Sequence, residues 1–251
     1  MPEASAAAEV ELRPGVRELL VVADSGHDGA AIARAIPSGA IRTLRLPLDH
    51  DVSDDVEGIA WRGGHLYAIV SSGYVQRFTP DGKGGLARDG KAYPIGPEPY
   101  ICHAKDPDDS NCGKNYEGLC LRSPSIVDRC AGYVASKQEG WLGCVVFQGD
   151  KLVLDLIKPR LALGLGKKTL SDCAFGAAGG PAENDLLVTT NIFGGSTTYE
   201  VHEGSGVLTP LDVTGLPSNE AIAIDRDGAL YQFMDGNSDT SPALRSTCSG
   251  W

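Results

Sequence analysis

The stretch that decides the fold reads DVEGIAWRGGHLYAIVS and runs from Asp55 to Ser71. It starts with acidic residues, continues as an apolar run, turns at two glycines and returns as a second apolar run ending in a polar residue. Two short apolar runs joined by a glycine turn are typical of an antiparallel hairpin. The stretch therefore predicts two buried β-strands.

The same pattern recurs along the chain. Its first run is found again around Glu117, Asp172 and Glu220, and its second runs end 44 to 66 residues apart, at Asp24, Ser71, Lys137, Asn191 and Asp235. This interval suits one four-stranded blade per copy. Five copies predict an all-β propeller of five blades with four antiparallel strands each. A six-bladed propeller and a sandwich or other barrel are the alternatives.

The expected domain organisation is simple. All-β chains of 251 residues commonly form one domain, and 32 glycines and 15 prolines indicate many tight turns. We expect residues 15–251 to form a single propeller domain. Residues 1–14 are interpreted as a leader or as a strand that closes the ring, since the last copy has no obvious fourth strand.

Charge and cysteine content narrow the function classes. A net charge of −11 would repel phosphate backbones and anionic lipids, so we expect no nucleic-acid partner and no membrane insertion. Many cysteines suit an oxidising compartment, so we expect a periplasmic or secreted protein with disulfides. The chain contains seven cysteines, namely Cys102, Cys112, Cys120, Cys130, Cys144, Cys173 and Cys248. Because this number is odd, at least one thiol is free or bonded between chains.

The repeat also predicts which polar side chains come together. The innermost strand of each propeller blade lines the central channel, so equivalent strand positions meet around one axis. Candidate metal ligands at this rim are Asp24, Glu57, Glu117, Asp172, Asn191, Glu220 and Asp235. Such a ring of oxygens suits calcium. The alternative is structural, with polar side chains capping backbone amides around a water-filled channel.

Two further features are candidates for chemistry. Asp106, Asp108, Ser110 and Glu117 stand at the first, third, fifth and twelfth places of an EF-hand-like loop, although the sixth place is not glycine. A loop closed by a Cys102–Cys112 disulfide is the alternative. His27 and His103 lie close to the expected rim and are the candidate general acid or base.

The segment from Glu57 to Trp61, followed by a turn and the run from His65 to Ile69, resembles the first-blade signature of the gluconolactonase-like and phytase-like esterase propellers. The run that starts at Glu117 is similar. The resemblance implies that Glu57 is a calcium ligand, completed by Asn191 and Asp235 from other blades. Those families usually have six blades, whereas this chain shows five copies of the repeat.

Two functions from different classes follow from these observations. The first is a calcium-dependent hydrolase that acts on a lactone or ester at the mouth of the channel. The second is a non-catalytic exported propeller that binds a small molecule or a protein at its rim. A histidine within reach of the ion favours the enzyme, whereas a channel filled by side chains favours the binding protein.

Overall fold

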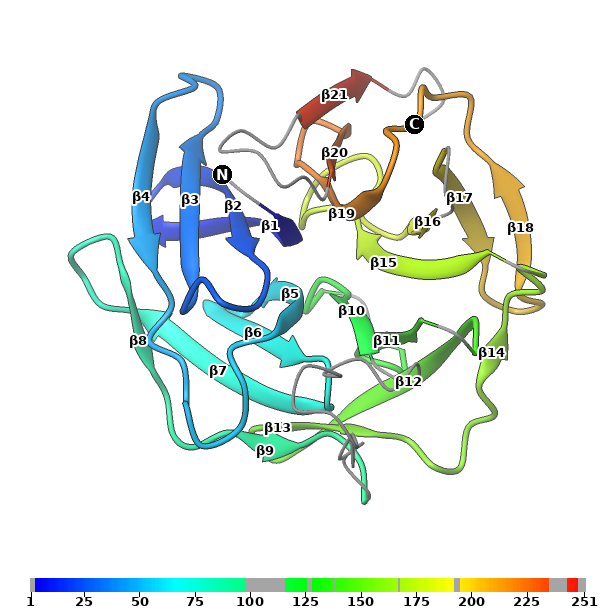
Figure 1. Cartoon of the computed structure of the whole chain (residues 1–251), viewed down its shortest axis with the longest axis horizontal. Helices are drawn as coiled ribbons and strands as arrows, with labels where there is room; N and C mark the ends of the chain where they lie inside the picture. The colour runs from blue at the N-terminus through cyan, green and yellow to red at the C-terminus, as the bar shows by residue number, and fades with distance from the viewer. Residues whose placement is uncertain are drawn as a thin grey trace.

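The protein is described by a computed structural model that covers residues 3–97, 116–125, 128–137, 139–166, 168–191, 195–234 and 243–247. Within these ranges the regular structure consists of β-strands, arranged as five antiparallel sheets around a common axis (Figure 1). The five-bladed propeller predicted from the repeat is therefore confirmed. The described part of the chain holds no helix of the length and apolarity that crossing a membrane requires.

Each sheet is a meander of consecutive strands. The first blade contains β1 (Ala4–Arg13), β2 (Val16–Ala23), β3 (Ala30–Ala35) and β4 (Ile41–Arg45). The second contains β5 (Val56–Arg62), β6 (His65–Val70), β7 (Tyr74–Pro80) and β8 (Leu86–Arg88), with β9 (Tyr93–Pro94) also paired to β7. The third contains β10 (Tyr116–Leu121), β11 (Gly132–Ser136), β12 (Trp141–Gln148) and β13 (Lys151–Leu154), with β14 (Leu161–Ala162) also paired to β12.

The fourth blade contains β15 (Thr169–Phe175), β16 (Leu186–Asn191), β17 (Thr197–His202) and β18 (Val207–Pro210). The described strands of the fifth are β19 (Asn219–Ile224), β20 (Ala229–Met234) and β21 (Ala243–Thr247). The innermost strands are β1, β5, β10, β15 and β19, and each contacts the innermost strands on both sides of it (Figure 1).

The N-terminal residues are part of the first blade. Strand β1 pairs with β2 as the innermost strand of that blade, so it is neither a leader nor the missing outer strand of the last blade. The sequence interpretation of residues 1–14 is corrected accordingly. It missed this strand because the alanine-rich segment Ala4–Ala8 lacks the branched and aromatic residues that mark the other inner strands.

Five apolar clusters hold the ring together, each shared by two neighbouring blades. Phe78 and Leu20, for example, are fully buried between the second and first blades, and Leu142 and Leu170 between the third and fourth. A blade is therefore covered on both faces. This double burial explains why strands such as β6 are continuous apolar runs and do not alternate with polar residues.

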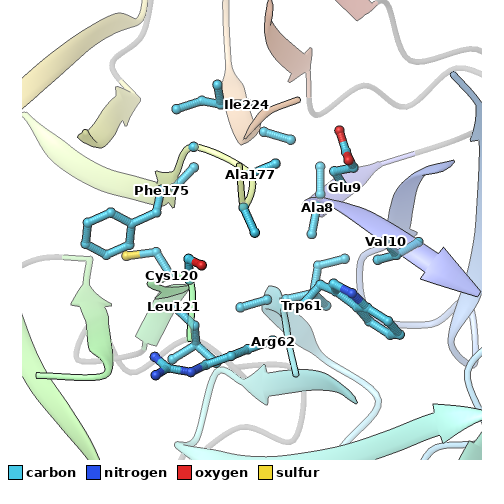
Figure 2. Close-up of a pocket in the computed structure, with 18 of the residues that line it drawn as sticks. Ala8, Glu9, Val10, Trp61, Arg62, Cys120, Leu121, Phe175, Ala177 and Ile224 are labelled. Carbon is cyan, nitrogen blue, oxygen red and sulfur yellow. The ribbon is translucent and has the colours of Figure 1, made fainter. Parts of the chain in front are cut away.

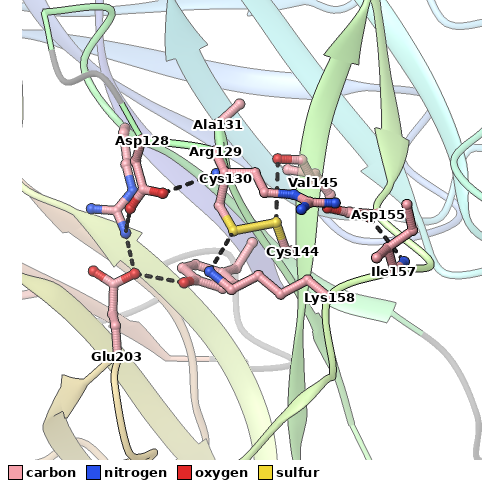
Figure 3. Close-up of a disulfide and its surroundings, with 12 residues drawn as sticks. Asp128, Arg129, Cys130, Ala131, Cys144, Val145, Asp155, Ile157, Lys158 and Glu203 are labelled. Carbon is pink, nitrogen blue, oxygen red and sulfur yellow. Dashed lines mark hydrogen bonds and ion pairs between the residues drawn. A yellow bond between two sulfur atoms is a disulfide. The ribbon is translucent and has the colours of Figure 1, made fainter.

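Two disulfides reinforce the third blade. Cys120–Cys173 joins β10 to β15 and so links the third and fourth blades. Cys130–Cys144 joins the segment before β11 to β12, and the Lys158 ammonium donates a hydrogen bond to Cys130 Sγ at 3.0 Å (Figure 3). The expectation of disulfides is confirmed for these pairs. The remaining cysteines, Cys102, Cys112 and Cys248, lie outside the described residues.

Candidate metal centre

Every inner strand carries an irregularity near its start. The register against the second strand shifts by one residue, because each inner strand contains one extra residue, namely Ser5, Glu57, Glu117, Ser171 and Glu220. Such β-bulges bend the strand and redirect a side chain. Three of the five bulged residues are glutamates, and all five occupy equivalent positions at one end of the channel.

Glycines after two of these glutamates allow the inner strands to approach each other closely. A Cβ on Gly58 would lie 2.4 Å from the backbone nitrogen of Leu119, and a Cβ on Gly118 would lie 2.9 Å from the backbone nitrogen of Cys173. Both distances are shorter than van der Waals contact allows. The Glu-Gly pairs recognised in the sequence therefore combine a channel-end carboxylate with the tight packing that brings the carboxylates together.

Three carboxylates form the closest group. Asp24 follows β2, Asp55 precedes β5 and Glu57 is the bulged residue of β5, and an oxygen from each lies within 4.8 Å of an oxygen of the others. Glu57 is only 8% exposed, whereas the two aspartates are partly exposed. The Ser71 hydroxyl donates a hydrogen bond to Asp55, and the Ser25 amide donates one to Asp24 at 2.6 Å.

Two further pairs surround this group. The Lys137 ammonium lies 2.9 Å from the carboxylate of Glu117, which is 1% exposed. The Asn191 amide donates a hydrogen bond to Glu220 at 2.7 Å. The partners in these contacts stand at or just after the ends of second strands, namely Ser71, Lys137 and Asn191. The ends of second strands therefore lie next to the starts of inner strands, as the repeat predicts.

The carboxyl groups influence one another strongly. Burial raises the pKa of Asp24 to about 7, and the charges of Asp55 and Glu220 add to this effect. Burial also raises the pKa of Glu117 to about 8, against the opposing effect of Lys137. The pKa of Glu57 is raised well above its usual value by burial and by the charges of its neighbours, first among them Glu117. The cluster therefore needs protons or a cation to offset its charge.

The donor set suits a hard divalent cation. Calcium takes carboxylate oxygens at about 2.3–2.6 Å, so two ligands on opposite sides of one ion lie up to about 5 Å apart. The separations within Asp24, Asp55 and Glu57 fall inside this limit. The described residues offer neither sulfur nor imidazole within this group, which argues for calcium over zinc.

The remaining predicted site residues are placed differently. Asp172 lies one position after the bulge, and its carboxylate accepts hydrogen bonds from the backbone amides of Cys173 at 2.7 Å and Ile222 at 2.8 Å. Ser171 holds the position equivalent to Glu57. The His27 ring bonds the carboxylate of Glu3 at 3.1 Å. Asp235, His103 and the aspartates of the EF-hand-like loop, Asp106 and Asp108, lie outside the described residues.

One member of the closest group was not predicted as a site residue. Asp55 lies two positions before Glu57, just outside the strand, where an acidic residue is easily interpreted as part of a turn. The acidic start of the repeat, Asp55-Val56-Glu57, provides the signal that could have found it, since both carboxylates stand at the same strand start. The sequence places Lys137 at a strand end on the rim but does not indicate its ion pair with Glu117.

Fold and site together define a five-bladed propeller with a buried carboxyl cluster at one end of its channel. No protein-family model matches the chain, and no curated protein matches it. Among solved structures, luciferin-regenerating enzyme is similar with a TM-score of 0.52 and 11% identity, over 100% of this chain and 94% of that one.

Two other solved structures are less similar. Virginiamycin B lyase from Staphylococcus aureus has a TM-score of 0.46 and 13% identity, over 98% of this chain and 70% of that one. The Dos1 propeller has a TM-score of 0.45 and 10% identity, over 99% of this chain and 60% of that one. At 11% identity, the similarity to luciferin-regenerating enzyme concerns the propeller fold alone.

Proposed function

We propose that the protein is a calcium-dependent hydrolase of a lactone or ester that acts at the carboxyl-rich end of its channel. The observation that carries the proposal is the approach of the Asp24, Asp55 and Glu57 carboxylates to within 4.8 Å of one another. A group of buried like charges is unstable by itself, and a bound cation is the simplest way to offset it. When bound there, calcium supplies a Lewis acid that polarises a carbonyl oxygen.

Residues beside the ion site supply the groups that hydrolysis needs. Glu117 has a pKa near 8, so it exchanges a proton in the neutral range, as a general acid or base must. Lys137, 2.9 Å away, is a cation that can orient an anionic substrate group or leaving group. His27 is a second candidate for proton transfer, held by Glu3, and His103 is proposed from the sequence alone.

A specific observation also favours the second candidate function, a non-catalytic propeller that binds a ligand or protein at its rim. Lys137 already offsets one negative charge of the cluster. Asn191 in the fourth blade donates a hydrogen bond to Glu220 in the fifth. Such contacts would stabilise the ring without any reaction. The disulfides Cys120–Cys173 and Cys130–Cys144 support our further proposal of a periplasmic or secreted location for either function.

The test starts with calcium. Chelator-treated protein is titrated with calcium by calorimetry, beside Glu57→Gln and a control, Glu11→Gln, which changes an exposed glutamate of β1 at the other end of the channel. We expect binding by the wild type and by the control, and at least about tenfold weaker binding by Glu57→Gln. Absence of binding by the wild type would refute the metal site.

The second stage separates the two functions. Aliphatic lactones and aryl esters are screened with calcium and with chelator, using the wild type and Glu57→Gln. Turnover that requires calcium and is lost in Glu57→Gln supports the hydrolase. Calcium binding without turnover of either substrate class supports the rim-binding propeller, in which the ion has a structural role.

A further inference from the structure

A cavity lies at the opposite end of the channel from the carboxyl cluster. Its volume is about 180 Å³, and the ends of all five inner strands contribute to its wall (Figure 2). Its lining includes none of the residues of the carboxyl cluster at the strand starts. Because each end of the channel has its own lining, the cavity is a second candidate site, independent of the proposed metal.

The wall of the cavity combines apolar side chains with a smaller share of polar and charged groups. Trp61, Leu121, Phe175 and Ile224 come from four different blades, and Figure 2 shows the Trp61 and Phe175 rings directed outward from the opening. An apolar protein cavity of roughly 150 Å³ is large enough to hold benzene. A ligand with an apolar body the size of one aromatic ring therefore matches the space.

Most of the charges at the cavity already offset one another. The Glu9 carboxylate accepts hydrogen bonds from the Arg17 guanidinium at 2.9 and 3.0 Å and from the Arg226 amide at 2.8 Å. Arg17 also contacts Asp227 at 3.2 Å. Glu11 is exposed and accepts the Gly15 amide of its own hairpin. The charges of these residues largely cancel, so they contribute little net charge to the wall of the cavity.

Arg62 differs from the other two arginines of the cavity. It forms no ion pair with any residue that the structure describes; one N–H donates to the Ala131 carbonyl at 2.8 Å, and the guanidinium lies 5.2 Å above the Phe147 ring. Burial and the neighbouring charge of Arg122 lower the pKa of Arg62. A partly buried guanidinium at the wall of a cavity, with no ion-pair partner among the described residues, favours binding of an anionic group.

We propose that this cavity binds a small amphipathic carboxylate, with an apolar body of about one aromatic ring among the ends of the inner strands and the carboxylate on Arg62. A guanidinium matches the geometry of a carboxylate and can form two parallel hydrogen bonds with it. A phosphate ester is disfavoured, because the other two arginines of the described cavity wall, Arg17 and Arg226, already face Glu9 and a second negative charge would need a further cation.

Calorimetry in the presence of chelator tests the proposal. The chelator removes calcium, so the result does not depend on the proposed metal site. The probes are benzoate, benzyl alcohol and benzylammonium, which share one ring and differ in charge. We expect the wild type to bind benzoate at least about tenfold more tightly than benzyl alcohol, since a hydrogen bond between charged groups is a strong one. Benzylammonium is expected to bind most weakly.

Three variants locate the binding. Arg62→Gln removes the preference for benzoate, Arg62→Lys retains part of it, and Ala177→Phe, which fills the cavity from its rim, abolishes binding of both ligands. Arg34→Gln changes an exposed arginine of β3 and leaves all affinities unchanged.

Ala177→Phe and Arg62→Lys keep the test valid if Arg62→Gln fails to fold. Equal affinity for benzoate and benzyl alcohol, no binding by the wild type, or unchanged binding by Ala177→Phe would each overturn the proposal.

Discussion

The Lys137 ammonium lies 2.9 Å from the carboxylate of Glu117, at the point where β11 ends opposite the bulge of β10. This contact places one fixed positive charge inside a cluster of buried carboxyl groups that includes Glu57 and Glu220. Burial by itself lowers the pKa of a lysine, but the facing carboxylates reverse that effect and raise the pKa of Lys137. Lys137 therefore remains charged and competes with any cation for the same carboxylates.

Replacing Lys137 by glutamine is expected to tighten calcium binding. The substitution removes a positive charge that acts on Glu57, one of the proposed ligands, and a nearby charge is worth about 1 kcal/mol even when it is well screened. We expect the calcium affinity to rise by about tenfold, measured by calorimetry at pH 8. An unchanged affinity would show that calcium binds away from Glu117 and Lys137.

The stability of the calcium-free protein should fall as the pH rises. Asp24 has a pKa of about 7 in the folded protein against 3.8 as its ordinary value, so between these values the folded state holds a proton that the unfolded chain has released. Folding then becomes less favourable with increasing pH. We expect a lower Tm at pH 8 than at pH 5 in chelator.

Calcium should remove this pH dependence, because its binding requires the carboxylates to be ionised. Its affinity should increase between pH 6 and 8, and saturating calcium should restore the Tm at pH 8. Asp24→Asn gives the control, since an amide at this position does not titrate. A Tm in chelator that rises steadily from pH 5 to 8 would contradict the assignment of a raised pKa to this cluster.

Glu9 closes the ring between the first and last blades. It contacts Arg17 in its own blade and the Arg226 amide in the fifth, and its side chain is 6% exposed. Glu9→Gln should destabilise the protein by about 2 kcal/mol, because it leaves the partly buried Arg17 guanidinium with only the exposed carboxylate of Asp227 as a counter-ion. For a chain of this size, the expected decrease in Tm is about 4–8 °C. Glu11→Gln, two residues along the same strand, should leave the Tm unchanged; equal effects would argue against the closure role.

Gly58 is required for the approach of β5 to β10. In Gly58→Ala the new Cβ would lie 2.4 Å from the Leu119 nitrogen, so the two inner strands must move apart. We expect a loss of about 1–3 kcal/mol in the free energy of unfolding, as for other overpacked sites, together with weaker calcium binding because Glu57 moves with its strand. Gly204→Ala has no atom within 4 Å of the new Cβ and is the control. Calcium affinity equal to that of the wild type would indicate that the bulge does not position Glu57.

The two disulfides should contribute unequally to stability. Cys120–Cys173 spans 53 residues and Cys130–Cys144 spans 14, and loop-closure entropy predicts about 4 and about 3 kcal/mol for such loops. Double serine variants of each pair, compared by urea unfolding, should therefore show a larger loss for the Cys120–Cys173 pair. A larger loss for Cys130–Cys144 would show that local contacts, such as that with Lys158, outweigh chain entropy.

The sequence by itself determined the fold class and the number of blades. Apolar runs, glycine turns and a recurring interval suffice for this, because each blade is a local meander whose strands pair with their neighbours in the chain. The same local pattern identified Glu57, Glu117 and Glu220 as equivalent positions. It also showed that Asp24, Lys137 and Asn191 end second strands, and therefore lie at the same end of the channel.

Only the tertiary structure decided which of these groups meet. The bulge in β15 places Ser171 in the position equivalent to Glu57 and turns Asp172 to backbone amides, a one-residue shift that no apolar pattern records. The role of Ala4–Arg13 as an inner strand, and the cavity formed by all five strand ends, depend on contacts between distant parts of the chain. Closing the ring brings these segments together, and ring closure is a long-range property that local sequence does not encode.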